Sequence, residues 1–180
     1  WKNINDQIWI IGSNASESSI GASSYLEYFH GLVTGRPPEI NLQDEKYCQS
    51  FLRDAILKNF IASSHDVSDG GLAIALSECC ILSGKGANIQ LEERNARLDS
   101  LLFSEGGSRI LFSLNKNEES NFLNFLKTNS KDFGRNIYVK KIGVVSEQNL
   151  DITLQDQKLC NLRVDELTDK FNNSISNCFY

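Results

Sequence analysis

Residues 61–83 read IASSHDVSDGGLAIALSECCILS, and three local patterns follow one another along this stretch. Ile61 to Ser64 is a short run with strand character, His65 to Gly71 is polar and ends in two glycines, and Leu72 to Ser83 is apolar on almost every side. Polar residues followed by glycines between apolar runs indicate a turn, and a helix that is apolar all round is typical of a protein interior. The stretch therefore predicts a strand, a turn and a buried helix.

Helical and strand patterns continue to alternate on both sides of this stretch. Apolar residues at helical spacing predict helices over residues 22–30, 44–59, 118–127 and 164–174. Period-two or β-branched runs predict strands over residues 7–11, 87–91, 109–114 and 136–145, and a hairpin of 151–154 with 158–162. Because the late strands lie close together, we predict an α+β fold, an α/β sandwich with a mixed sheet, rather than a doubly wound parallel one. We expect residues 1–180 to form a single domain.

The composition limits the classes of partner. Hydrophobic residues make up 41% and charged residues 23% of the chain, its formal net charge is -5, and the sequence pI is about 5.1. A mildly acidic chain without a Lys/Arg run has no electrostatic footprint for nucleic acid or for an anionic membrane surface. The sequence contains no apolar run long enough to span a bilayer. We therefore expect neither a nucleic-acid nor a membrane partner.

The chain begins at Trp1 and contains no Met, so we expect it to be a piece of a longer polypeptide or a processed form. Its five cysteines include no CxxC pair, and Cys79 and Cys80 are adjacent. This spacing does not suit a metal site, and the odd number of cysteines does not suit a disulfide framework. We expect reduced cysteines in a cytoplasmic protein, behaving as small apolar residues.

The polar turn before the helix carries the densest chemistry. Helix N-termini favour anions, and Gly70 and Gly71 would let a phosphate approach the backbone closely. Asp66 and Asp69 are oxygen donors of the kind that Mg²⁺ prefers, and the Ser68 hydroxyl can hydrogen-bond a phosphate. The same residues also suit a purely structural role, with Ser68 or Asp69 as helix cap and the two glycines in a tight turn.

Four further polar residues are candidates for a cleft or for a structural role. His65 could act as an acid or base, but no nucleophile is paired with it in the sequence, so we favour a hydrogen bond within the turn. Glu105 and Arg109 flank a Gly-Gly pair, which favours a salt bridge or turn stabilisation, with a cleft contact as the alternative. Glu78 lies in the predicted buried helix and needs a partner, for which we expect a loop N–H.

A family resemblance adds to these readings. Residues 64–78, SHDVSDGGLAIALSE, resemble the "AHDxSDGGLxxxLxE" signature of phosphoribosylformylglycinamidine synthase. Residues 84–87 (GKGA), 102–110 (LFSEGGSRI), 21–27 (GASSYLE) with His30-Gly31, and Ile142-Gly143 resemble further segments of that family in the same order. The resemblance covers roughly residues 7–170. The HDxSDGGL form is similar to the second of the family's two repeats, so the chain looks like the last domain of the synthetase module.

The resemblance implies both a fold and an activity. The fold would be that of the C-terminal domain of aminoimidazole ribonucleotide synthetase. The parent enzyme would use ATP and glutamine-derived ammonia to convert the amide of formylglycinamide ribonucleotide to an amidine, in purine biosynthesis. It further implies ATP or ADP and Mg²⁺ as cofactors, Asp66 as a metal ligand, and Ser68, Asp69, Gly70 and Gly71 as nucleotide contacts. The implied partners are the remaining domains of the synthetase chain, a glutaminase subunit, a small accessory subunit and the ribonucleotide substrate.

One departure and two alternatives accompany this resemblance. The family's first repeat carries an Arg in the loop that here reads Ser13-Asn-Ala-Ser-Glu-Ser-Ser-Ile20, which has no basic residue. We therefore expect this domain not to hold the substrate phosphate, and its nucleotide site could be structural rather than catalytic. The alternatives are another ATP-using member of the superfamily, such as a selenophosphate synthetase or thiamine monophosphate kinase, and a mainly structural interaction module. We expect the 180-residue chain alone to be inactive.

Overall fold

The fold is built on a mixed seven-stranded sheet with the strand order β2-β4-β1-β5-β3-β6-β7. The computed structural model describes residues 1–13, 20–92, 97–130 and 137–174. All neighbouring strands are antiparallel except β3 and β6, which are parallel. The strands are β1 (Gln7–Ser13), β2 (Ile61–Asp66), β3 (Gly86–Leu91), β4 (Ile110–Leu114), β5 (Ile137–Ser146), β6 (Asn149–Leu154) and β7 (Gln157–Arg163).

Strand β1 lies near the centre of the sheet and contributes to both of its faces. Ile8 and Ile10 belong to one buried cluster, whereas Trp9 and Ile11 belong to the other. Successive side chains of a strand point to opposite faces, so a central strand with four apolar residues in succession must be covered on both sides. The apolar run at the start of the chain therefore contributes to two cores, one on each face of the sheet.

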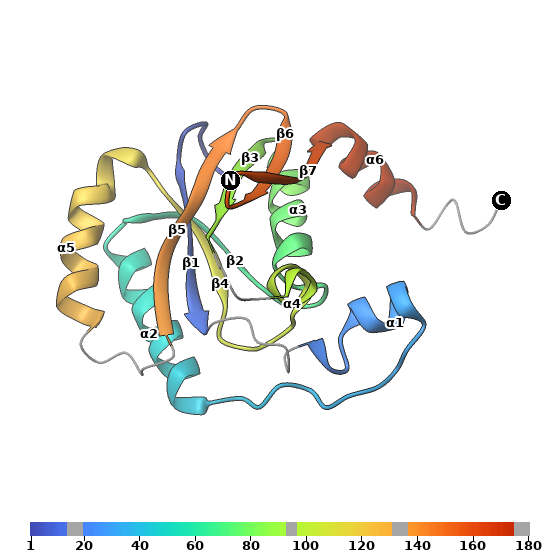
Figure 1. The fold of residues 1–180 in the computed structure, drawn as a ribbon. Coiled ribbons are helices and arrows are strands. Elements are labelled where there is room, and N and C mark those ends of the chain that lie inside the picture. Colours follow the sequence, from blue (N-terminus) through green and yellow to red (C-terminus); the bar gives the residue numbers. More distant parts are fainter. Residues whose placement is uncertain (14–19, 93–96, 131–136, 175–180) are drawn as a thin grey trace.

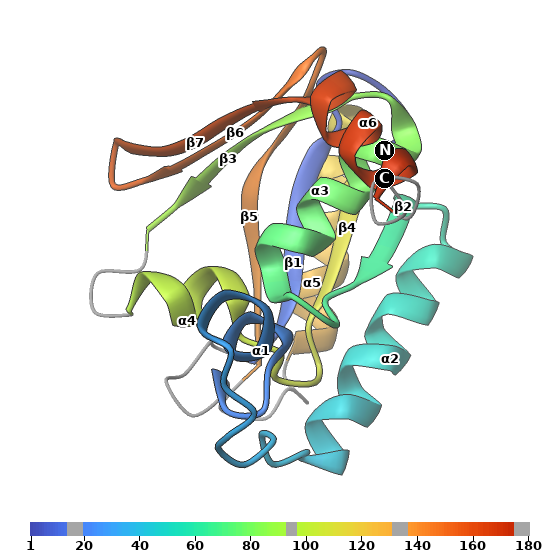
Figure 2. The ribbon, with the colours of Figure 1, turned by 90° about the vertical axis from the view of Figure 1, so that its right-hand side faces the viewer.

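Helices cover both faces of the sheet (Figure 1). One face carries α2 (Leu42–Leu57) and α5 (Glu119–Asn129), which follows the short 3₁₀ helix η2 (Lys116–Glu118). The other face carries α3 (Gly71–Ser83) and α4 (Leu98–Phe103), with α6 (Val164–Asn173) beyond them. Helix α1 (Ser24–His30) lies apart from the sheet (Figure 1) and is joined to α2 by segment 31–41, whose course can be followed in Figures 1 and 2.

The predicted α+β sandwich with a mixed sheet is confirmed, and most predicted elements are present with shifted ends. The turn is shorter than predicted, because His65 and Asp66 continue β2 and pair with Leu111 and Ile110 of β4. Helix α3 was predicted to be buried, and this holds only for its inner side. Ile74 and Leu82 on its outer side are 42% and 76% exposed.

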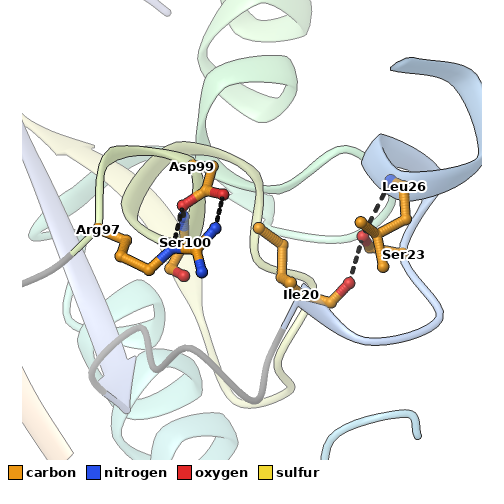
Figure 3. Close-up of polar contacts among 6 residues, drawn as sticks. All are labelled: Ile20, Ser23, Leu26, Arg97, Asp99 and Ser100. Carbon is orange, nitrogen blue, oxygen red and sulfur yellow. Dashed lines mark hydrogen bonds and ion pairs between the residues drawn. The ribbon is translucent and has the colours of Figure 1, made fainter. Parts of the chain in front are cut away.

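Helix α4 was not predicted. Its start is stabilised locally, because the Asp99 carboxylate accepts a hydrogen bond from the Ser100 N–H at 2.8 Å and pairs with Arg97 (Figure 3). No helix in the described part of the chain is both long and apolar enough to cross a membrane.

Candidate nucleotide site at the start of helix α3

The turn between β2 and α3 places its polar side chains outward. β2 is an edge strand, and after it the Val67 N–H still donates to the Arg109 carbonyl at 3.0 Å, so the chain keeps its pairing with β4. The Val67 side chain is 6% exposed and enters the core cluster beneath α3. The neighbours of the buried Val67 are exposed, with Asp66 before it in the chain and Ser68 and Asp69 after it. These three residues are the part of the predicted site that a ligand could reach.

The two glycines of the turn are buried. Gly70 has φ +74° and Gly71 has φ +68°, a region that side chains rarely adopt, and the Gly71 N–H donates to the Ser68 carbonyl at 3.0 Å. A Cβ atom on Gly71 would lie 2.7 Å from backbone atoms of Phe103 and Ser104. Close packing of α3 against the end of α4 therefore accounts for glycine at position 71, whether or not a ligand binds here.

The carboxylate of Glu105 occupies the N-terminal end of α3. Its Oε1 atom accepts a hydrogen bond from the Gly70 N–H at 2.7 Å and another from the Ser24 N–H, at the start of α1, at 2.8 Å. Helix α3 has no side-chain cap of its own. Because unpaired N–H groups at helix starts favour anions, Glu105 is well placed to stabilise both helices. An incoming phosphate would meet the exposed side of the turn and not the Gly70 N–H.

Arg109 lies next to this turn but points into the protein. Its guanidinium donates to the Ser104 side-chain oxygen at 3.1 Å and to the Ser104 carbonyl at 3.0 Å, while its Nε has no partner among the described residues. Burial lowers the pKa of the guanidinium. Among the described residues, Arg109 and Glu105 do not form the salt bridge that we favoured. Instead, Arg109 stabilises the segment between α4 and β4, and Glu105 stabilises the starts of α1 and α3.

The His65 ring contacts α3 and also lies near the exposed carboxylate of Asp66, with its Nδ1 atom 3.9 Å from Asp66 Oδ1. Its Nε2 lies 3.5 Å from a carboxylate oxygen of Glu78, and its Nδ1 lies 2.7 Å from the Asp66 carbonyl oxygen. The hydrogen bond that we expected from His65 within the turn is present. We expected a loop N–H as the partner of Glu78, but the carboxylate lies next to His65 instead. Glu78 is only partly buried, so it does not require a buried hydrogen-bond donor.

The metal-binding capacity of the turn is limited. In the parts of the chain that the structure describes, no three His, Cys, Asp or Glu side chains come together in a way that could hold a metal ion. The Asp66 side chain is 78% exposed. One exposed carboxylate fits a Mg²⁺ ion that takes most of its ligands from phosphate oxygens and water, and does not fit a metal held by the protein alone.

A family comparison places this fold. The family model described as "AIR synthase related protein, C-terminal domain" matches residues 3–154, which is most of the chain. The chain belongs to this family. The match covers β1 to β6 and includes the whole turn at the start of α3.

Relatives of this family member include phosphoribosylformylglycinamidine synthase subunits PurL from Prochlorococcus marinus. The chain is 87% identical over 179 residues to PurL of the subspecies pastoris, and 80% identical over 179 residues to PurL of strain MIT 9515. Each match covers 99% of this chain and 23% of the relative, so the chain spans about a quarter of the relatives' length. The resemblance seen in the sequence motifs is confirmed.

Solved structures support the fold alone, because their sequence identity to this family member is low. Thermotoga maritima PurL complexed with FGAR matches with a TM-score of 0.75 at 16% identity, over 93% of this chain and 28% of that chain. The same protein complexed with ATP matches with a TM-score of 0.69 at 16% identity, over 93% of this chain and 26% of that chain. The aminoimidazole ribonucleotide synthetase type of C-terminal fold is thereby confirmed.

The roles of the site residues stay predictions. The structure brings Asp66, Ser68 and Asp69 together on one exposed turn and places Gly70 and Gly71 beneath it. Sequence reasoning missed that Glu105 joins the starts of α1 and α3. No local capping pattern could reveal this contact, because Glu105 and Gly70 are 35 residues apart in the chain. Residues 14–19, most of the loop that lacks a basic residue, lie outside the described ranges.

Proposed function

We propose that this chain is the C-terminal domain of an ATP-dependent phosphoribosylformylglycinamidine synthase. The observation that carries the proposal is the 87% identity over 179 residues to a PurL subunit. In the reaction, ATP would phosphorylate the amide oxygen of formylglycinamide ribonucleotide, and ammonia would then displace phosphate to leave an amidine. Phosphorylation makes a leaving group of an amide oxygen that is otherwise a poor one, and bound Mg²⁺ supplies charge stabilisation for such a transfer.

Within this enzyme the turn after β2 would contribute one side of a nucleotide site. The Asp66 carboxylate would be a Mg²⁺ ligand, the Ser68 hydroxyl would donate to a phosphate oxygen, and Asp69 would contact the nucleotide through its backbone or a bridging water. Gly70 and Gly71 would shape the turn so that these groups face outward. Because the turn has no cation of its own, the remaining contacts would come from another domain of the same polypeptide. The isolated 180-residue chain would then bind nucleotide weakly and have no activity.

The proposed surroundings follow from the same relatives. The remaining domains of the synthetase chain would be permanent partners, and a glutaminase subunit and a small accessory subunit would assemble with the full enzyme in the cytoplasm. Support for further subunits comes from the solved "PurLQS" structure of Thermotoga maritima, whose PurL chain shares this fold with a TM-score of 0.70.

The test uses the parent chain, which is the synthetase polypeptide that carries this domain. If necessary, the parent chain is made from the 87%-identical relative by replacing its matching stretch with these 180 residues. The substitution Asp66→Asn keeps the shape of the side chain and removes its charge. Copurifying nucleotide and ammonia-dependent amidine formation are measured on the same preparations. Asp54→Asn, an exposed carboxylate on α2 with a side-chain exposure of 54%, is the control for the charge change.

Each outcome assigns a role. Loss of both nucleotide and rate in Asp66→Asn, with Asp54→Asn unchanged, would mean that this domain supports the catalytic site. Loss of nucleotide with most of the rate kept would make the site structural and the domain mainly a scaffold. If wild-type parent chain forms no amidine, the proposed function is wrong; if Asp66→Asn changes nothing, only the metal assignment is wrong.

A further inference from the structure

Four large apolar side chains are exposed together on α1 and just after it. Tyr28 and Val33 are each 86% exposed, Phe29 is 74% exposed and Leu32 is 50% exposed. We refer to these four residues as the α1 patch. Single exposed apolar residues are ordinary, but a group of them within six positions of the chain marks a site of interaction. Ile40 and Leu42, further along the chain, are also exposed.

The α1 patch is held in a fixed geometry. The Ala22 N–H donates to the Thr34 carbonyl at 2.8 Å, which closes the base of the loop that carries α1. Ser23 caps the helix by accepting from the Leu26 N–H (Figure 3), and Gly31 ends it with φ +65°. A surface that is already ordered loses little conformational entropy when a partner binds it.

A stack of three aromatic rings connects the patch to the body of the domain. The Tyr25 ring lies 4.6 Å from that of Phe103 on α4, at an interplanar angle of 7°. On its other side it lies 5.4 Å from the ring of Phe29, at 11°. Phe29 is therefore the outermost ring of the stack, and its outer side offers an apolar surface to a partner.

Helix α1 is short and is held to the domain by a small number of contacts. The structure describes all seven of its residues, and none of these seven is buried. Isolated helices of fewer than about 12 residues are unstable in water, so short helices depend on packing. In this domain the packing consists mainly of the Tyr25–Phe103 stack and the hydrogen bond from the Ser24 N–H to Glu105.

We propose that the α1 patch is the surface on which another domain of the same polypeptide packs. This inference rests on the proposed function, since it requires that the chain is part of a longer synthetase. This chain covers 23% of the matched relative, which is therefore about four times as long. The family model describes a C-terminal domain. Interfaces that never separate are more apolar than transient ones, and a covalently linked domain is present at high effective concentration. Both fit a patch made of two aromatic and two aliphatic side chains.

Thiol labelling of the parent chain tests this proposal. Tyr28→Cys and Val33→Cys are introduced one at a time into a parent chain in which Cys160, Cys178 and the reactive cysteines of the other domains are replaced by Ser; Cys48, Cys79 and Cys80 of this domain are buried. Lys127→Cys on the exposed side of α5 is the control. Maleimide labelling rates are divided by the rate of the same variant in denaturant. We expect the two patch thiols to react at least about tenfold more slowly than Lys127→Cys, at every protein concentration, because labelling would require local opening of the interface.

Three results would overturn the proposal. Labelling of both patch thiols as fast as Lys127→Cys would mean that nothing covers the patch. Protection that disappears on dilution would assign the patch to a second copy of the chain, and protection that appears only when separate subunits are added would assign it to them. Amidine formation measured on the same preparations separates this inference from the proposed function: an active parent chain with freely labelled Tyr28→Cys refutes only the inference.

Discussion

The Glu105 carboxylate accepts hydrogen bonds from the Gly70 N–H and the Ser24 N–H, so its removal leaves two backbone donors without a partner. We expect Glu105→Ala to lower the free energy of unfolding by about 1–3 kcal/mol. Glu105→Gln keeps an acceptor oxygen and loses only the charge near two helix starts, so its cost should be about 0.3–1 kcal/mol. Urea denaturation of both variants measures the difference. Equal losses in the two variants would show that charge, and not hydrogen bonding, is the main contribution.

The buried thiol of Cys48 makes stability depend on pH on the alkaline side. Burial, with a smaller contribution from the carboxylates of Glu45 and Asp44, raises the pKa of the Cys48 thiol from 9.0 to about 12. Above pH 9 the unfolded chain releases this proton while the native chain keeps it, so stability falls as pH rises toward 12. Below pH 9 this thiol has no effect.

A comparison with Cys48→Ala isolates this contribution from those of other groups that titrate in the same range. Between about pH 8 and pH 10, wild type should lose about 1 kcal/mol more unfolding free energy than Cys48→Ala. Urea midpoints at the two pH values provide the measurement. The expectation fails if the two proteins lose stability in parallel.

At the scale of elements, the two ends of α3 provide a matched pair of glycines. Gly71 and Gly84 have nearly the same backbone angle, with φ of +68° and +65°. In the part of the chain that the structure describes, a Cβ atom on Gly84 would meet nothing within 4 Å, whereas one on Gly71 would lie 2.7 Å from backbone atoms of Phe103 and Ser104. Gly84→Ala should therefore cost only the backbone strain, about 1–2 kcal/mol.

Gly71→Ala has the same strain and must also move α3 away from α4, which should add about 1–3 kcal/mol. Thermal unfolding of the two variants side by side gives the difference. If Gly71→Ala is no worse than Gly84→Ala, the packing of α3 against α4 is looser than the contact distances indicate, and glycine at position 71 would then need another explanation, such as a ligand.

The elements that sequence predicted well are those whose signal is local. β1, α2, β5 and the strand–turn–helix of residues 61–83 have periodic apolar patterns that span most of their length. Helix α4 has only six residues, too few for a clear helical period, and its start depends on the Arg97–Asp99 pair. The outward-facing part of the candidate site followed from residue types on one turn. The contact of Glu105 with two distant helix starts did not, because it depends on the packing of α1, α3 and α4 together.

At the scale of the whole molecule, both buried clusters contain residues of β1, which favours the single domain that we expect over residues 1–180. Leu76 is fully buried in the cluster under α3, and Trp9 is 5% exposed in the cluster under α2 and α5. We expect Leu76→Ala to lower the free energy of unfolding by about 2–5 kcal/mol. If the sheet and its two helical layers unfold as one unit, the fluorescence of Trp9 should report this loss although Trp9 lies on the opposite face.

The measurement follows Trp9 fluorescence in a Trp1→Phe background, together with the accessibility of the Cys80 thiol, which lies in the same cluster as Leu76. Both probes should shift to lower denaturant concentration by the same amount. A matched change on the other face, Phe122→Ala, should shift both probes as well, because Phe122 is fully buried against the ring of Trp9 at 5.3 Å. A Cys80 transition that moves with Leu76→Ala while the Trp9 transition stays in place would mean that the two faces unfold separately. The strands β1, β4 and β5, which contribute to both cores, would then be insufficient to couple them, and residues 1–180 would not behave as one domain.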